Sequence, residues 1–144
     1  MAFARMTSAM FALGVVVATF SAGSAWAGGP GGVVEGGDDI SRAVGSGVLN
    51  GELVGFSATG PTNDGATAAV IVACQQAGAE DCSRDEVTND NLCVVSVGAE
   101  DGSGIVSGGA GPTVEAARDD AFRHAADAEA ALDPGARVLE SACP

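Results

Sequence analysis

Residues 50–62 (NGELVGFSATGPT) and residues 101–113 (DGSGIVSGGAGPT) carry the same turn and strand-breaking residues at a constant spacing of 51. The Asn-Gly and Asp-Gly pairs that open the two stretches tolerate the positive φ angles of a tight hairpin turn. Each stretch ends in Gly-Pro-Thr, in which Gly-Pro stops a strand and the threonine accepts hydrogen bonds from the first free amides of a helix. The spacing therefore predicts a duplicated unit, with a hairpin followed by a helix in each half.

Hydrophobic patterns on either side of these stretches complete the two units. In the first half we expect strands at 44–49, 53–56 and 82–87 and a helix at 63–77. In the second half we expect strands at 92–97, 104–110 and 137–143 and a helix from 114 to about 132. The predicted fold class is α+β: two ββαβ repeats, about 44–90 and 91–144, with an antiparallel sheet, two helices and disulfide staples.

Small apolar side chains recur at helical spacing in both expected helices. They are Ala66, Ala69, Val70, Ala73 and Ala77 in the first, and Val114, Ala117, Ala121, Ala125, Ala128 and Leu132 in the second. Such stripes indicate the faces that pack on the sheet. Ile71 and Val72 widen the first stripe, which predicts burial on more than one side of that helix.

The first 27 residues have the pattern of a secretory signal peptide. Arg5 supplies a positive start, residues 10–20 (MFALGVVVATF) form a short apolar run, and residues 25–27 (Ala-Trp-Ala) form a cleavage site. The run is too short for a bilayer core, which needs roughly 20 residues. We therefore expect export to the extracellular space, followed by a Gly-rich flexible linker at 28–43 and a domain at 44–144.

Charge excludes several classes of partner. The whole chain has a formal net charge of −13, and its 19 acidic residues all follow residue 27, where five arginines and no lysine oppose them. Such a surface repels nucleic acid phosphates and anionic lipid, so we expect neither nucleic acid nor, after signal cleavage, a membrane as partner.

Four cysteines, at positions 74, 82, 93 and 143, lie in the exported part. An even count in a small exported domain predicts two disulfides, with three possible connectivities. A zinc site would favour short Cys-x-x-Cys pairs with histidine, whereas these spacings are wide and His124 is the only histidine. Disulfides are therefore the favoured interpretation.

The sequence offers few catalytic candidates. His124 is the single plausible general base, but Asp120 and Asp127 lie one turn away, so a local ion pair accounts for it. Ser103, Ser107 and Ser141 lack the G-x-S-x-G elbow, and the Gly-rich stretch at 102–113 lacks the lysine of a phosphate loop. Acidic groups at 80–81, 85–90 and 100–101 do not follow a calcium-loop pattern. We expect no catalytic, cofactor or metal site.

Across about residues 44–144 the chain resembles the DUF4189 domain family, small exported proteins found largely in GC-rich bacteria. The resemblance rests on an Ala-rich helix ending in Cys74, Cys82 shortly after it, Cys93 opening a strand of small and β-branched residues, the helix after Thr113, and a closing Ser141-Ala142-Cys143. The sequence departs from the family's pattern in having no Trp or Tyr on the hairpin strands. The family has no established activity, so the resemblance implies fold and compartment.

With this resemblance, we expect Cys74 to pair with Cys82 across the helix-to-strand connection, and Cys93 to pair with Cys143 between the opening and closing strands of the second unit. The expected function is a secreted, non-catalytic binding or effector module acting on an extracellular or cell-envelope protein. The alternative is a small extracellular hydrolase or an inhibitor of one. A binding module should present an exposed sheet face or edge, whereas an enzyme should present a pocket in which His, Asp and Ser converge.

Overall fold

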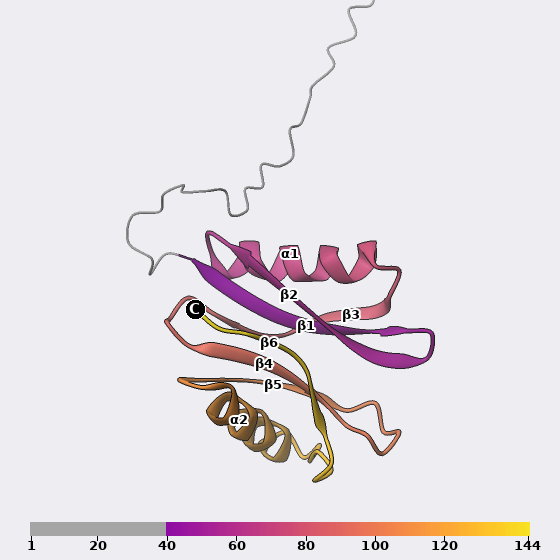
Figure 1. Ribbon diagram of the computed structural model, residues 1–144. Coiled ribbons are helices and arrows are strands. Elements are labelled where there is room, and N and C mark those ends of the chain that lie inside the picture. Colours follow the sequence, from indigo (N-terminus) through magenta and orange to yellow (C-terminus); the bar gives the residue numbers. More distant parts are fainter. Residues whose placement is uncertain (1–39) are drawn as a thin grey trace, which may run out of the picture.

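The computed structural model describes residues 40–144 (Figure 1). The expected signal peptide at 1–27 and the expected linker up to residue 39 lie outside the described residues. The first strand, β1 (Ser41–Leu49), begins three residues before the expected domain boundary. Ser41 and Ala43 are buried, and Ala43 packs with Ala66 and Val70. The linker prediction was wrong for residues 41–43, because small side chains at alternate positions of a strand fit beneath a helix without being large and apolar.

Each half of the chain forms a ββαβ unit, as predicted. The first unit contains β1, β2 (Glu52–Gly60), α1 (Asn63–Gln76) and β3 (Glu80–Thr88). The second contains β4 (Cys93–Gly98), β5 (Val106–Gly111), α2 (Val114–Asp127) and β6 (Arg137–Ala142). In each unit the opening strand is the centre of an antiparallel three-stranded sheet, with orders β2-β1-β3 and β5-β4-β6. The expected α+β fold of two repeats is confirmed.

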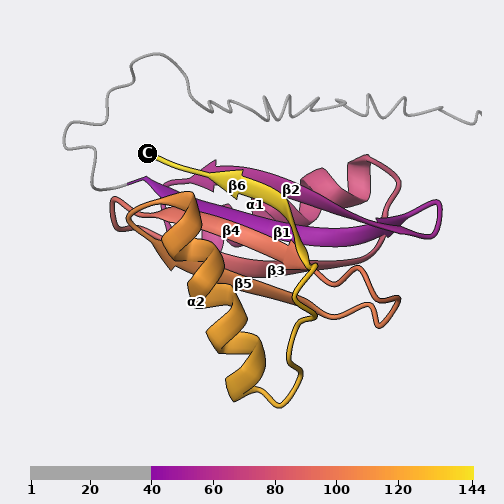
Figure 2. The same ribbon diagram turned by 60° about the horizontal axis from the view of Figure 1, so that its bottom comes forward.

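The two sheets face one another, and a helix covers the outer face of each (Figures 1 and 2). Strand β1 lies over β4, β2 lies along β6, and β3 lies along β5. The two units are thus arranged about an approximate two-fold axis that passes between the central strands. Because helices cover the outer faces and the sheets cover each other's inner faces, the expected exposed sheet face is not present in the part of the chain that the structure describes, and only strand edges remain open.

The two hairpins turn differently although their turn residues correspond. In the first, Leu49 pairs with Glu52, and Asn50 and Gly51 take φ angles of 53° and 82°. In the second, the last ladder pair is Gly98 with Val106, and Ala99 donates its amide to the Ile105 carbonyl beyond it. The second register leaves an odd number of residues at the tip, so a two-residue turn cannot close it. A wider loop at 100–104 results.

Glycines allow each helix to lie against the main chain of its hairpin. A Cβ atom on Gly60 would lie 2.6 Å from the amide nitrogen of Ala66, and one on Gly111 would lie 2.7 Å from that of Ala117. The same contact therefore occurs in both units at the residue before the helix-capping Pro-Thr. It brings the buried alanines of the helices close enough to fill the space over small strand residues.

The helix ends differ from the prediction in one unit. Helix α1 ends close to the expected position, but α2 ends at Asp127 and not near Leu132. Glu129 takes a φ of 58° and the Ala130 amide bonds back to the Ala125 carbonyl, which closes the last turn as a left-handed cap. Leu132 still reaches the core, because the loop after the helix folds it under α2. The apolar side chain of Leu132 therefore indicates a buried residue, not a longer helix.

Helix α1 buries one face only. Ala66, Val70 and Cys74 are its buried residues, whereas Val72 is 46% exposed. The predicted burial on more than one side was wrong, because nothing in the described chain packs on the outer side of this layer.

Both expected disulfides are present. Cys74 bonds to Cys82, which ties the end of α1 to β3 and is called the α1 bridge below. Cys93 bonds to Cys143, which ties the start of β4 to the C-terminal end. Every cysteine is thereby paired. No helix among residues 40–144 is long and apolar enough to cross a membrane.

Candidate functional site

The hairpin end, defined as the β1–β2 turn together with the loop at 100–104, is the first candidate. Both tips project from the same end of the sandwich, opposite the C-terminus (Figures 1 and 2). Between them lies an open depression of about 360 Å³ lined by Val48, Gly51, Glu52, Leu53, Ala99, Glu100, Gly102, Gly104 and Arg137. Corresponding segments of the two units thus form its two walls.

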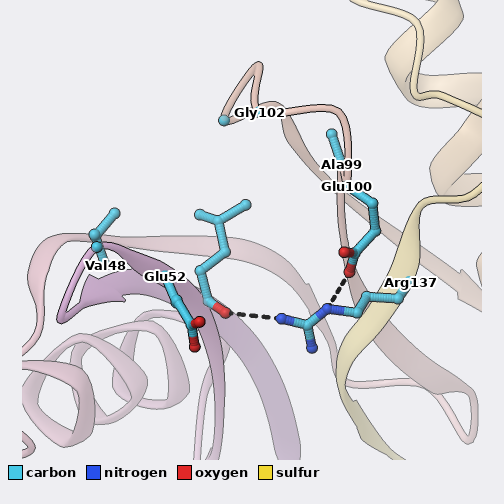
Figure 3. A pocket seen from close by; sticks show the side chains of 9 residues that line it. Val48, Glu52, Ala99, Glu100, Gly102 and Arg137 are labelled. Atoms are coloured by element: carbon cyan, nitrogen blue, oxygen red, sulfur yellow. Dashed lines mark hydrogen bonds and ion pairs between the residues drawn. The ribbon is translucent and has the colours of Figure 1, made fainter.

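Arg137 holds the two walls together (Figure 3). Its guanidinium donates to the Leu53 carbonyl at 3.2 Å and forms an ion pair with Glu100. Arg137 opens β6, so one side chain from the second unit's closing strand contacts both hairpins. Glu52 and Glu100, which line the depression, and Asp101, which follows Glu100, are exposed. The rim is therefore acidic, and Arg137 is the one cation among the lining residues.

Hydrogen bonds from main-chain amides to aspartate side chains fix the conformation of the loop at 100–104. The Ser103 amide donates to Asp101 at 2.9 Å, and the Asp133 carboxylate accepts the Glu100 amide at 3.0 Å. Hydrogen bonds from the Ser103 side chain and then its amide lower the pKa of Asp101 from its ordinary value. Asp101 therefore keeps its negative charge to a lower pH than an ordinary aspartate does.

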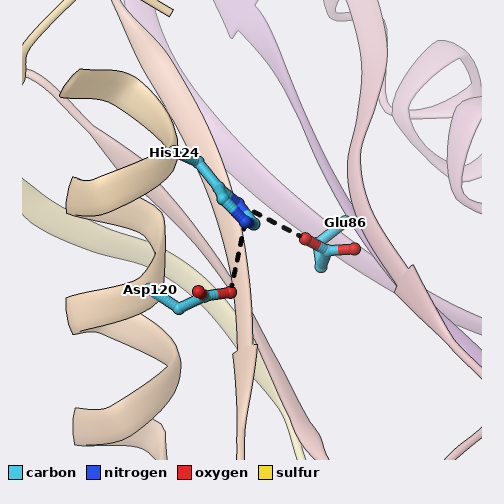
Figure 4. Close-up of side chains that lie close together, drawn as sticks. All are labelled: Glu86, Asp120 and His124. Atoms are coloured by element: carbon cyan, nitrogen blue, oxygen red, sulfur yellow. Dashed lines mark ion pairs between the residues drawn. The ribbon is translucent and has the colours of Figure 1, made fainter. Parts of the chain in front are cut away.

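The second candidate, called the His124 cluster below, consists of Glu86, Asp120 and His124 (Figure 4). His124 and Asp120 lie one turn apart on α2, with 3.5 Å between Nε2 and Oδ2. Glu86 comes from β3 in the other unit, and its Oε2 lies 3.8 Å from Nδ1 of His124. The imidazole is half exposed, whereas the two carboxylate side chains are about 20% exposed. His124 also lines an open depression of about 320 Å³.

Each member of the His124 cluster is also fixed by a main-chain group. His124 Nδ1 lies 2.7 Å from the Gly108 carbonyl oxygen. Asp120 Oδ2 accepts the Ala110 amide at 3.0 Å, and Glu86 Oε1 accepts the Val87 amide at 3.0 Å. Because a carbonyl only accepts, Nδ1 carries the proton in this contact. In the neutral form of the imidazole the lone pair is then on Nε2, the nitrogen nearer to Asp120.

A β-bulge in β3 explains how Glu86 reaches the second unit. Val44 pairs with Glu86 and Gly45 pairs with Arg84, so Asp85 is an extra residue in the ladder. Two consecutive acidic side chains can then point toward the second sheet. Asp85 accepts a hydrogen bond from the buried Ser96 of β4, and Glu86 meets His124.

Two other candidates from the sequence, Ser107 and the Gly-rich stretch at 102–113, have packing roles. Ser107 donates its hydroxyl to the Ala121 carbonyl at 2.8 Å. A Cβ atom on Gly108 would lie 2.2 Å from the Asp85 carbonyl oxygen, and one on Gly109 would lie 2.1 Å from the Ala117 carbonyl oxygen. The Gly-rich stretch therefore lets β5 approach β3 on one side and α2 on the other, which is the packing role weighed against a phosphate loop.

Sequence reasoning found two members of the His124 cluster and missed the third. Asp120 was expected beside His124 from its helical spacing, and the structure brings them together. The other expected neighbour was Asp127, but the second carboxylate in the structure is Glu86. No local spacing relates Glu86 to His124; the one available signal was the run of charge in a segment predicted as a strand. Arg123 also forms an ion pair with Asp120, with 3.0 Å between Nη2 and Oδ1.

Comparisons of the chain with models of known families, with curated proteins and with solved structures found no match.

Proposed function

We propose that this protein is an exported, non-catalytic binding or effector module that acts on an extracellular or cell-envelope protein. The signal-like pattern of residues 1–27 supports export. Two disulfides that pair every cysteine support an oxidising compartment. We further propose that residues 44–144 belong to the DUF4189 domain family, on the cysteine spacing and the Ala/Gly pattern that they share with it.

The observation that carries the binding proposal is the hairpin end. Its two loops come from different units, and Arg137 fixes them to each other through Leu53 and Glu100. Loops held by a rigid scaffold are the usual place for recognition residues. The acidic rim with one central cation favours a partner surface that is basic with an acidic group at its centre.

Affinity capture from culture medium and cell envelopes, followed by mass spectrometry, tests this proposal. The bait is the exported protein, and the comparison is with Glu52→Arg, which reverses a charge at the exposed tip of the hairpin end. Asp127→Arg is the matched control, because it makes the same charge change at the last residue of α2, outside the depression. We expect a partner that Glu52→Arg loses and Asp127→Arg keeps. Equal capture by all three proteins would refute the hairpin end as the binding surface.

Export has its own test. N-terminal sequencing of protein from the medium should begin at Gly28, because cleavage is expected after Ala27. Retention of the only Trp, Trp26, would contradict the proposed cleavage site and is easily detected by absorbance at 280 nm.

The alternative, a small extracellular hydrolase or an inhibitor of one, draws on the His124 cluster. A histidine beside a carboxylate at the border of an open depression is the arrangement that a general base requires. Against it, the nearby Ser107 hydroxyl is committed to a main-chain carbonyl, and the cysteines are all in disulfides. A folded His124→Ala protein that loses a measured turnover a hundredfold or more would favour the enzyme; unchanged partner binding by the same variant supports the binding module.

A further inference from the structure

We propose that Glu86, Asp120 and His124 form a binding site for one divalent transition-metal ion, with zinc as the best match. The site combines one imidazole nitrogen with two carboxylate oxygens. Zinc takes this mixture of ligands, and sites with three protein ligands keep a fourth position for water. The three donor atoms lie within 4.8 Å of one another.

The geometry around Nε2 of His124 fits a ligand better than a hydrogen bond. Nε2 lies 3.5 Å from Asp120 Oδ2, beyond the usual limit of about 3.2 Å for an N–H···O bond. Two ligands at about 2.1 Å from one tetrahedral ion lie about 3.4 Å apart. The separation of these two atoms is therefore already that of two ligands of a single ion.

The contact between His124 and Gly108 is the second observation. A metal-binding histidine typically donates its other ring N–H to a carbonyl or carboxylate, which fixes the ring and leaves the free nitrogen for the metal. Nδ1 of His124 makes this contact with the Gly108 carbonyl at 2.7 Å. Within residues 40–144, Nε2 has no hydrogen-bond partner, so its lone pair is open to an ion.

The carboxylates of Asp120 and Glu86 are also held in place by main-chain groups. The Ala110 amide holds Asp120 Oδ2 and the Val87 amide holds Glu86 Oε1, so main-chain bonds fix the side chains before an ion arrives. Glu86 Oε2 is not held by that bond and lies 3.8 Å from Nδ1 of His124, so this oxygen is the ligand atom that has to move toward an ion on Nε2. Arg123 on Asp120 and Arg84 at the edge of the depression reduce the local negative charge without occupying the ligand atoms.

An ion at this position would join the two repeats. Glu86 belongs to β3 of the first unit, whereas Asp120 and His124 belong to α2 of the second. An ion that binds only the folded state stabilises it by RT ln(1 + c/Kd), where c is the ion concentration, so the unfolding temperature rises with the ion concentration. The proposal is independent of the hairpin end, which lies elsewhere on the molecule and contains none of these residues.

Calorimetric titration of chelator-treated exported protein with zinc chloride tests the proposal. We expect one ion per chain and an increase in melting temperature. Glu86→Gln and Asp120→Asn should each weaken zinc binding at least about tenfold, since even outer-shell changes cost 10–100-fold. Asp119→Asn is the matched control, because it removes the same charge from an exposed neighbour on α2 and should change the affinity less than twofold.

The single histidine provides a readout that needs no variant. Zinc should shift the Nε2 resonance of His124 in nitrogen-15 spectra, whereas equal concentrations of magnesium should not. An unshifted resonance at millimolar zinc, or equal weakening by Asp119→Asn and Asp120→Asn, would overturn the proposal. Either result would leave His124 as a member of an ordinary ion-pair cluster.

Discussion

Replacing Gly109 with alanine tests how closely β5 approaches α2. A Cβ atom at this position would lie 2.1 Å from the carbonyl oxygen of Ala117 and 2.4 Å from the amide nitrogen of Ala121. Both are main-chain atoms of a helix, so neither can rotate away as the end of a side chain can. Strand and helix have to separate, which loosens the alanine layer that forms the core of the second unit.

The expected cost follows from these two contacts. Overpacking a core costs about 1–3 kcal/mol, and we expect about 3 kcal/mol for Gly109→Ala because two main-chain contacts are violated at once. In a domain of this size each kcal/mol lowers Tm by roughly 4–8 °C, so the variant should melt roughly 12–24 °C below the wild type. Total stabilities are only about 5–15 kcal/mol, so the effect is large.

Far-UV circular dichroism is the appropriate assay, because residues 28–144 contain neither Trp nor Tyr for fluorescence. Gly102→Ala is the matched control. Gly102 has a φ of 80° and no atom within 4 Å of the new methyl group, so its replacement costs only the strain of a left-handed residue, about 1 kcal/mol. If Gly109→Ala is no more destabilising than Gly102→Ala, the close approach of β5 to α2 is refuted.

Three further predictions concern stability. Replacing Cys93 and Cys143 together by serine should cost about 1.5 kcal/mol more than removing the α1 bridge, because chain entropy gives about 4.1 kcal/mol for the longer loop and about 2.6 for the shorter; urea unfolding that reverses this ranking would contradict the entropic explanation. Thr113→Ala should cost about 1 kcal/mol, since its hydroxyl caps α2; an unchanged urea midpoint would show that the cap contributes nothing. Ser96→Ala should cost about 1.5–3 kcal/mol because its hydroxyl donates to the Asp85 carboxylate; a neutral result in the same assay would exclude this bond.

Features fixed by neighbouring residues were predictable from the sequence. Thr62 and Thr113 cap their helices as expected, accepting amides three residues ahead at 3.0 and 3.1 Å. The Asn50-Gly51 turn has the positive φ angles that its residue types indicated. In each case the physical cause lies within a few residues, so the sequence carries it directly.

The arrangement of the two sheets was not predictable in the same way. Nothing in a strand's own residues states which sheet its inner face will meet, and Val44 and Val94 would be equally buried under a helix or under a second sheet. The predicted end of α2 was wrong for a related reason. Leu132 is apolar because it enters the core from a loop, and periodicity cannot distinguish this from one more helical turn.

The His124 cluster depends both on local sequence spacing and on the tertiary arrangement of the two units. Helical spacing places Asp120 beside His124, but Glu86 arrives only because β3 lies along β5 and because Asp85 is an extra residue in the ladder. Without the bulge, strict alternation would turn Asp85 toward α1, and Ser96 would lose its carboxylate acceptor. The charge run of β3, which made it the weakest strand prediction, is therefore explained by its position: an edge strand accepts charge, and the bulge directs two of those charges to the other unit.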